Sequence, residues 1–66
     1  MITRSELSRM SKDQLIEVYL GAKYADAPRE VHWNIRRNLS ARAYTRAKIG
    51  TMIINAQREA ESEDTA

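Results

Sequence analysis

The segment 41–61 carries apolar residues on two opposite sides of the helix that its composition predicts. At about 100° per residue, one stripe contains Ile49, Met52, Ile53, Ala56 and Ala60, and the other contains Ala43, Tyr44, Ala47, Gly50 and Ile54. A helix that is apolar on two sides cannot bury both of them against a single neighbour. The segment is therefore either the central helix of the fold, or one of its stripes is a dimer or partner surface.

The length of the chain adds weight to an association surface. A single domain over 1–61, followed by a disordered acidic tail at 62–66, is the expected organisation of these 66 residues. A domain of this size buries only about 60% of the surface that its unfolded chain exposes. Cys is absent and there is one His, so disulfides and metal sites are not expected to stabilise the fold. The expected additional source of stability is self-association as a homodimer, or docking on a protein partner.

Helix caps divide the chain into segments. The expected N-caps are Thr3, Ser11, Asp26 and Ser40. The first two are followed three residues later by Glu6 and Gln14, which is the spacing of a capping box. The fold class is therefore all-α: a small bundle with a short helix near 4–9 and three main helices near 12–24, 27–38 and 41–61. Because neither Gly nor Pro separates the last two, one continuous helix over 28–61 is the alternative.

The charge is distributed unevenly along the chain. Residues 29–48 contain Glu30 as their one acidic residue, whereas their basic residues are Arg29, Arg36, Arg37, Arg42, Arg46 and Lys48. The end of the chain is acidic, and this asymmetry predicts an anionic partner or masking of one block by the other. The candidate residues for binding nucleic acid or an acidic protein surface are Arg36, Arg37, Arg42, Arg46 and Lys48.

Two interpretations of this basic block remain open. Arg42 and Arg46 are i, i+4 neighbours, so they share one face of a helix over 41–61. Helices at 27–38 and 41–61 could form a helix-turn-helix in which 41–48 enters the major groove of DNA. The other interpretation is a solvated basic face that steers the chain to an acidic protein surface.

The only Trp of the chain lies in the same region. Trp33 is a candidate binding residue because Trp is enriched at the centres of protein interfaces. In so small a domain, we expect it instead to pack in the core, with His32 beside it at least half-exposed. The Tyr residues are expected in the core or at its rim.

Residues 10–22 combine a Ser-capped start, a Leu-Ile-Glu core and a Tyr followed three residues later by an Ala. Residues 35–39 add an Ile, a basic pair and a Leu. Together these features resemble the two helices of Sda-type checkpoint proteins, which are short antiparallel hairpins that bind and inhibit sporulation histidine kinases. The resemblance covers 10–39, and the segment after Ser40 has no counterpart in that family. It implies a hairpin that docks on the helices of another protein through Leu15, Ile16, Tyr19 and Leu20.

Catalysis is not expected. General acid–base or nucleophilic chemistry needs groups held within hydrogen-bond reach, usually in a pocket of roughly 300–1,000 Å³. The chain has one His, no Cys and no Gly-rich phosphate loop. We therefore expect no enzyme activity, no cofactor and no small-molecule substrate.

The same residues bear on where the protein acts. No segment has the pattern of a signal peptide or the roughly 20 apolar residues of a membrane span, so a cytoplasmic protein without membrane contact is expected. The leading hypothesis is a small regulatory or inhibitory protein that docks on a larger one. Its candidate contact residues are Tyr44, Ala47 and Ile54 in the second stripe, the four hairpin residues above, and Trp33. A small helix-turn-helix DNA-binding regulator is the alternative.

Overall fold

The computed structural model describes the backbone of residues 2–65 and the side chains of residues 2–61. The regular secondary structure of residues 2–65 consists of helices: α1 (Arg4–Leu7), α2 (Lys12–Lys23), α3 (Arg29–Leu39) and α4 (Arg46–Thr65). The predicted all-α class is confirmed. The predicted disordered tail, 62–66, lies outside the residues that are described in full and stays a prediction. Within the described part, no helix combines the length and the apolar character that crossing a bilayer requires.

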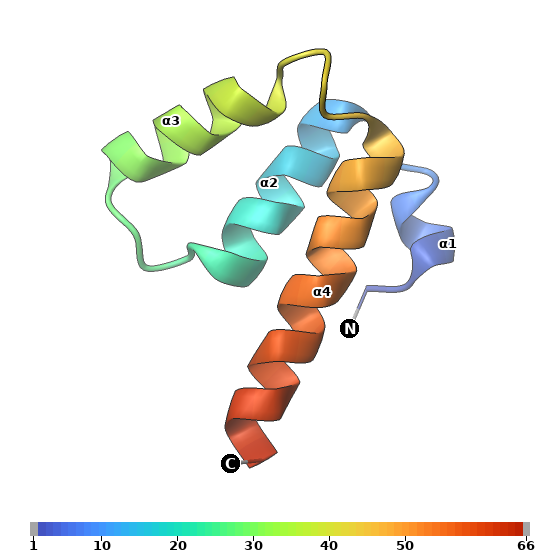
Figure 1. The fold of residues 1–66 in the computed structure, drawn as a ribbon, viewed down its shortest axis with the longest axis vertical. Helices are drawn as coiled ribbons and strands as arrows, with labels where there is room; N and C mark the ends of the chain where they lie inside the picture. Colours follow the sequence, from blue (N-terminus) through green and yellow to red (C-terminus); the bar gives the residue numbers. More distant parts are fainter. Residues whose placement is uncertain (1, 66) are drawn as a thin grey trace.

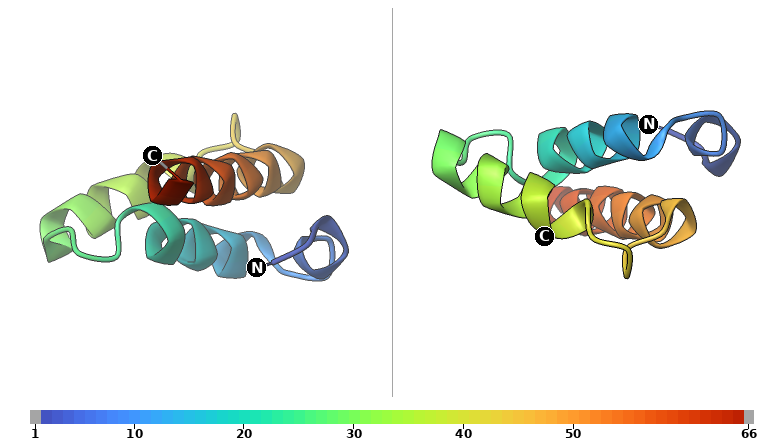
Figure 2. Two further views of the ribbon diagram at one scale, coloured as in Figure 1. Left: turned by 90° about the horizontal axis from the view of Figure 1, so that it is seen from below. Right: turned by 90° about the horizontal axis from the view of Figure 1, so that it is seen from above.

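The helices are arranged around α4. Helices α2 and α4 run side by side in the same direction, and α3 leads from the end of one to the start of the other (Figure 1). Views along the long axis place α1 next to the first half of α4 (Figure 2). The last turns of α4 extend beyond the end of α2 (Figure 1). Helix α4 therefore has neighbours on two sides, α2 and α1.

The core lies mainly between α2 and α4. Its buried residues are Leu7, Leu15, Ile16, Tyr19, Leu20, Leu39, Ile49, Ile53 and Ala56. On α4, Ile49, Ile53 and Ala56 recur at i, i+4 and i+7 and so form one continuous strip. This strip belongs to the first of the two predicted stripes; of the other two members of that stripe, Met52 is half-buried and Ala60 is exposed.

The N-terminal segment of the chain covers the later part of the second predicted stripe, around Gly50 and Ile54. Gly50 is buried, and a Cβ added there would lie 4.0 Å from Leu7 Cδ1. Two turns later, the Gln57 amide accepts the Ile2 N–H at 2.9 Å and donates to the Ile2 carbonyl at 3.1 Å. Ile54 lies between these contacts on the helix and is half-buried. Of the two predicted alternatives, the structure selects the central helix for this part of the stripe.

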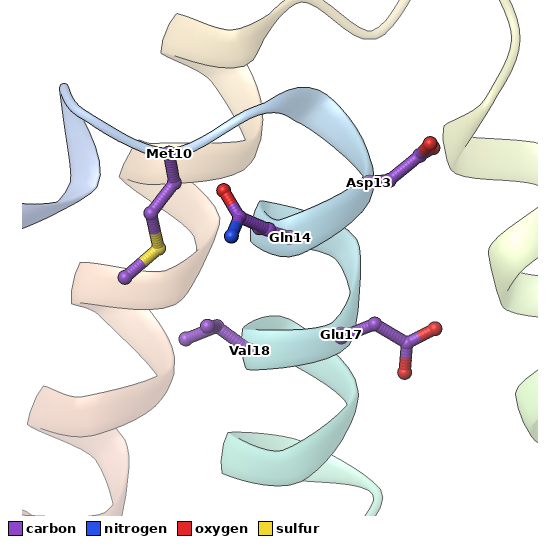
Figure 3. A pocket seen from close by; sticks show the side chains of 5 residues that line it. All are labelled: Met10, Asp13, Gln14, Glu17 and Val18. Carbon is purple, nitrogen blue, oxygen red and sulfur yellow. The ribbon is translucent and has the colours of Figure 1, made fainter.

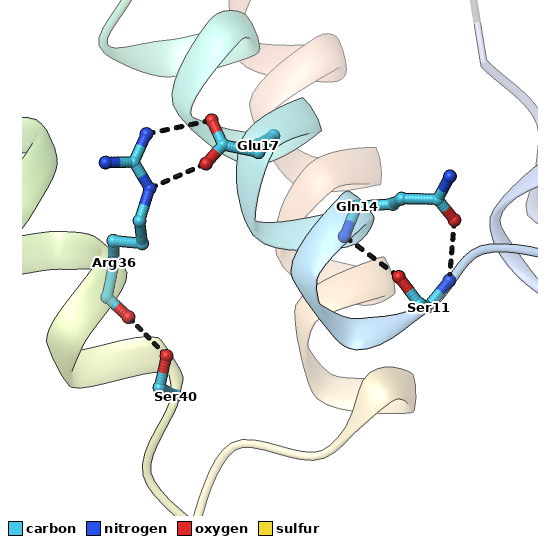
Figure 4. A network of polar contacts seen from close by, with 5 residues as sticks. All are labelled: Ser11, Gln14, Glu17, Arg36 and Ser40. Carbon is cyan, nitrogen blue, oxygen red and sulfur yellow. Dashed lines mark hydrogen bonds and ion pairs between the residues drawn. The ribbon is translucent and has the colours of Figure 1, made fainter.

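Two of the predicted caps are present. The Thr3 hydroxyl accepts the Glu6 N–H at the start of α1. At the start of α2, the Ser11 hydroxyl accepts the Gln14 N–H, and the Gln14 side chain accepts the Ser11 N–H, so the capping box is complete (Figure 4). These caps depend on neighbours three residues apart, which is why the sequence predicts them well.

The other two predicted caps are wrong. Helix α3 has Pro28 at its N-cap position, without a side-chain hydrogen bond from Asp26 or another residue. Ser40 ends α3 instead of starting α4, because its hydroxyl donates to the Arg36 carbonyl at 2.8 Å (Figure 4). The Thr45 hydroxyl caps α4 by accepting the Lys48 N–H at 3.2 Å.

A loop over residues 40–45 separates α3 from α4, so the predicted start of the last helix at 41 and the alternative of one helix over 28–61 are both wrong. Lys12, at the start of α2, donates from Nζ to the carbonyls of Ser40 and Ala41 at 3.2 and 2.9 Å. A cation at the C-terminal end of a helix satisfies carbonyls that have no partner in the helix and complements its macrodipole. This long-range contact stabilises the end of α3 at Leu39.

Candidate functional site

The apolar face expected from the resemblance is not a surface in this fold. Leu15, Ile16, Tyr19 and Leu20 are all buried, with 8% of their surface or less exposed. Helix α4 covers them, and α4 belongs to the segment that has no counterpart in the resemblance. These four residues are therefore core residues, and their assignment to a docking surface is corrected.

The second predicted stripe is divided between core and surface. Tyr44 is 36% exposed and Ala47 is exposed, whereas Ile54 is half-buried against the core. An open depression of about 380 Å³ is lined by Tyr44, Ala47, Lys48, Thr51 and Met52. A small apolar area around Tyr44 therefore remains accessible.

The most exposed large apolar side chain described is Trp33, on the outer face of α3. It is 57% exposed, so the expectation that it packs in the core is wrong. On α3, Val31, Ile35 and Leu39 recur at i, i+4 and i+8: Leu39 is buried, Ile35 packs against the core, and Val31 is half-buried. Trp33 follows Val31 by two residues, about 200° around the helix, and so faces away from the core. This offset is visible in the sequence and could have indicated the exposure.

Two arginines share the outer face with Trp33. Arg29, Trp33 and Arg37 recur at i, i+4 and i+8, and the Arg37 guanidinium lies 5.5 Å from the centre of the indole ring. This is cation–π geometry. Trp33 also separates two open depressions: one of about 580 Å³ lined by Arg29, Glu30, Trp33 and Asn34, and one of about 250 Å³ lined by Trp33, Arg36, Arg37 and Ser40. The outer face of α3 is thus an aromatic ridge between hollows with arginines on both sides.

Arg36 is not free to act in the same way. Its Nε and second terminal nitrogen donate to the two carboxylate oxygens of Glu17 at 2.6 and 3.0 Å (Figure 4). This bidentate pair lowers the pKa of the Glu17 carboxyl and raises the pKa of Arg36, mainly through the hydrogen bonds and to a smaller extent through the charge attraction. The pair joins α3 to α2 and compensates much of the charge of Arg36.

Lys48 and two of the remaining arginines are dispersed. Arg46 donates to the Ser8 carbonyl of the α1–α2 turn at 2.7 Å, and Lys48 donates to the Ala43 carbonyl at 3.1 Å. Arg42 is exposed in the loop over 40–45. The predicted pairing of Arg42 and Arg46 on one helical face is wrong, because α4 begins only at Arg46. For the same reason, the predicted DNA-recognition stretch 41–48 is not a continuous helix.

His32 has a structural contact. Its ring is half-buried, and its Nε2 is hydrogen-bonded to the Tyr24 carbonyl, which accepts. Tyr24 is the C-cap of α2, so this contact helps to hold the connection between α2 and α3.

A third surface lies on α2. Met10, Asp13, Gln14, Glu17 and Val18 line an open depression of about 370 Å³, with Met10 and Val18 at one side and the two carboxylates at the other (Figure 3). Glu17 is paired with Arg36 and Gln14 with Ser11, so two of its three polar side chains are already engaged. It offers a ligand fewer free polar groups than the outer face of α3.

Comparison of the chain with protein-family models, curated proteins and solved structures finds no match. The resemblance to Sda-type proteins therefore stays an expectation. The outer face of α3 is the candidate site that its own geometry supports best.

Proposed function

We propose that this chain is a small, non-catalytic binding protein that docks on an acidic surface of a larger protein through Trp33 and the arginines beside it, and thereby regulates or inhibits that partner. The observation that supports the proposal is the 57% exposure of Trp33 on a helix whose opposite face carries the buried Leu39 and the half-buried Ile35. Covering the exposed part of the indole would contribute on the order of 3 kcal/mol, about a hundredfold in affinity.

The surroundings of Trp33 favour binding in two further ways. The contact with Arg37 restricts the ring before a partner arrives, so less side-chain entropy is lost on docking. Arg29 and Arg37 lie one turn before and one turn after the ring, and charges at the rim of an interface steer a partner of opposite sign. A partner with carboxylates around an apolar pocket fits this arrangement.

A protein partner is favoured over nucleic acid. Binding to DNA draws its affinity from cations that neutralise phosphates, each lowering log K by about 0.9 per tenfold rise in salt. Arg36 is paired with the Glu17 carboxylate, and the contacts of Arg46 with Ser8 and of Lys48 with Ala43 place these two cations away from Arg37, so the cations do not form one phosphate-binding face. Arg37 lies over the Trp33 ring and would have to move for a base to stack there. The alternative of a helix-turn-helix DNA-binding regulator loses the recognition helix on which it depended.

The single Trp provides the test, because its fluorescence reports on the proposed site directly. The tagged chain is used to capture proteins from nuclease-treated lysate of the cells that make it, and a captured protein is then purified. Adding that protein should shift the Trp33 emission to shorter wavelength and protect it from iodide quenching. Binding should also weaken as salt rises.

Matched variants decide the outcome. Trp33→Ala, and Arg29→Gln combined with Arg37→Gln, should each lower the affinity at least tenfold with unchanged helicity. Tyr44→Ala removes another exposed aromatic outside the α3 face and should bind as the unchanged chain does. Equal binding by the Trp33 variant would refute the proposal, as would capture that disappears after nuclease treatment and returns with added duplex DNA.

A further inference from the structure

A groove between α1 and the first turns of α4 concentrates positive charge away from the α3 face. It has a volume of about 420 Å³ and is lined by Arg4, Leu7, Ser8, Arg46, Ala47 and Gly50. Small or apolar residues form most of this lining, whereas two arginines provide its charge. The groove shares none of these residues with the outer face of α3, so a ligand in the groove is independent of the proposed function.

The two arginines cross the boundary between the helices in opposite directions. Arg4 of α1 donates to the Thr51 hydroxyl of α4 at 3.3 Å, and Arg46 of α4 donates to the Ser8 carbonyl at 2.7 Å. Both acceptors are uncharged. Among residues 2–61, neither guanidinium lies within ion-pair distance of a carboxylate. Two positive charges thus line one concave surface without an anion.

Most of the hydrogen-bonding capacity of the two arginines is unused. A guanidinium has five N–H donors in a planar fork that matches the oxygens of carboxylates and phosphates. Arg4 and Arg46 each use one terminal nitrogen in the contacts above. The groove also lies beside the first turn of α4, where the helix macrodipole adds positive potential.

We propose that this groove binds a phosphate group, held between the guanidinium groups of Arg4 and Arg46. A phosphate monoester carries about −1.5 to −2 charges at neutral pH, which two arginines balance, whereas a carboxylate would leave one of them uncompensated. Its oxygens accept several hydrogen bonds at once, so one group can contact both helices. The small side chains of Ala47 and Gly50 leave room for the group that carries the phosphate.

Binding would join two helices that share few contacts. Helix α1 spans only Arg4–Leu7, and among its residues only Leu7 is buried. A ligand that contacts Arg4 and Arg46 together stabilises the docked position of α1 by mass action. Phosphate should therefore raise the unfolding temperature of the chain in addition to binding in the groove.

The two glycines provide a site-specific test. Gly50 lines the groove, whereas Gly21 lies on α2 with no atom within 4 Å of the place where its Cβ would be. In ¹⁵N-labelled chain at constant ionic strength, inorganic phosphate should shift the amide signal of Gly50 in a saturable way and leave that of Gly21 unchanged. We expect a dissociation constant in the millimolar range for inorganic phosphate. A short phosphoserine peptide is titrated in parallel. If the peptide binds more tightly than inorganic phosphate, the site is assigned to phosphorylated proteins; if the two bind equally, the site is assigned to free phosphate compounds.

Variants test the role of the arginines. Arg4→Gln and Arg46→Gln should each weaken phosphate binding about tenfold. Arg58→Gln removes the same charge from an exposed position outside the groove and should have no effect. Arg46→Lys keeps the positive charge that attracts phosphate. This variant should therefore retain part of the phosphate affinity that Arg46→Gln loses. Equal shifts of Gly50 and Gly21, an equal response to chloride, or unchanged binding by the Arg4 and Arg46 variants would overturn the proposal.

Discussion

Replacing the two glycines by alanine tests the position of α1 on α4. Gly21 and Gly50 both lie inside helices, α2 and α4, where Gly is less favourable than Ala by about 1 kcal/mol. An added Cβ at Gly21 meets no atom within 4 Å, so Gly21→Ala should stabilise the fold by about 1 kcal/mol through backbone entropy alone. In a domain of this size, this corresponds to about 4–8 °C in Tm.

At Gly50 the added Cβ would lie 4.0 Å from Leu7 Cδ1, which is an ordinary van der Waals distance. Gly50→Ala should therefore stabilise the fold by at least as much as Gly21→Ala, because the new methyl also makes a contact at a buried position. The extra contribution is at most about 0.8 kcal/mol, the value for one buried methylene. Thermal and urea unfolding followed by far-UV circular dichroism measure both substitutions.

A Leu7→Ala background separates the two contributions at Gly50. The backbone contribution should persist there and the contact with Leu7 should disappear, so the difference between backgrounds is the energy of that contact. A fall in Tm on Gly50→Ala, with a rise on Gly21→Ala, would contradict this placement of α1. It would mean that Leu7 lies closer than 4.0 Å to the position of the added Cβ and that Gly50 is required for the approach of α1.

Two other predictions concern the core. Ile53→Ala should lower the free energy of unfolding by about 2–5 kcal/mol, because Ile53 is fully buried between α2 and α4. Urea denaturation measures this free energy. A value within about 0.5 kcal/mol of that of the unchanged chain would show that Ile53 is not a core residue. Burial, and next the neighbouring Tyr24, raise the pKa of the Tyr19 hydroxyl. The stabilisation by Tyr19 is thus complete below its ordinary pKa of about 10 and is lost as pH rises through the raised value. Tm should fall in that range, and less so in Tyr19→Phe; an equal fall in both would show that another group is responsible.

The basic block does not act as one unit in the fold. Arg36 joins α3 to α2 through Glu17, and Arg46 joins α4 to the turn after α1. Arg29 and Arg37 remain beside Trp33 on the outer face of α3. Residues that are close in sequence therefore contribute to three different surfaces. This distribution is why net charge over a segment is a weak guide to nucleic-acid binding.

Features that depend on near neighbours can be predicted from the amino-acid sequence. The caps at Thr3 and Ser11 and the buried strip formed by Ile49, Ile53 and Ala56 follow from spacings of three and four residues. The exposure of Trp33 also follows from its place on α3, although the expectation that large apolar residues are buried in a small domain obscured it. In each case the physical cause lies within one helix.

Packing between the helices selects among several acceptable local choices. Ser40 and Thr45 are both suitable caps, and the contact of Lys12 with the carbonyls at the end of α3 favours a helix that stops at Leu39. The second apolar stripe of α4 needed a neighbour, and the N-terminal segment supplies it through Leu7 at Gly50 and Ile2 at Gln57. These contacts join residues that are far apart in the chain. No pattern within a single helix specifies them, because they depend on how the separate apolar faces are packed together.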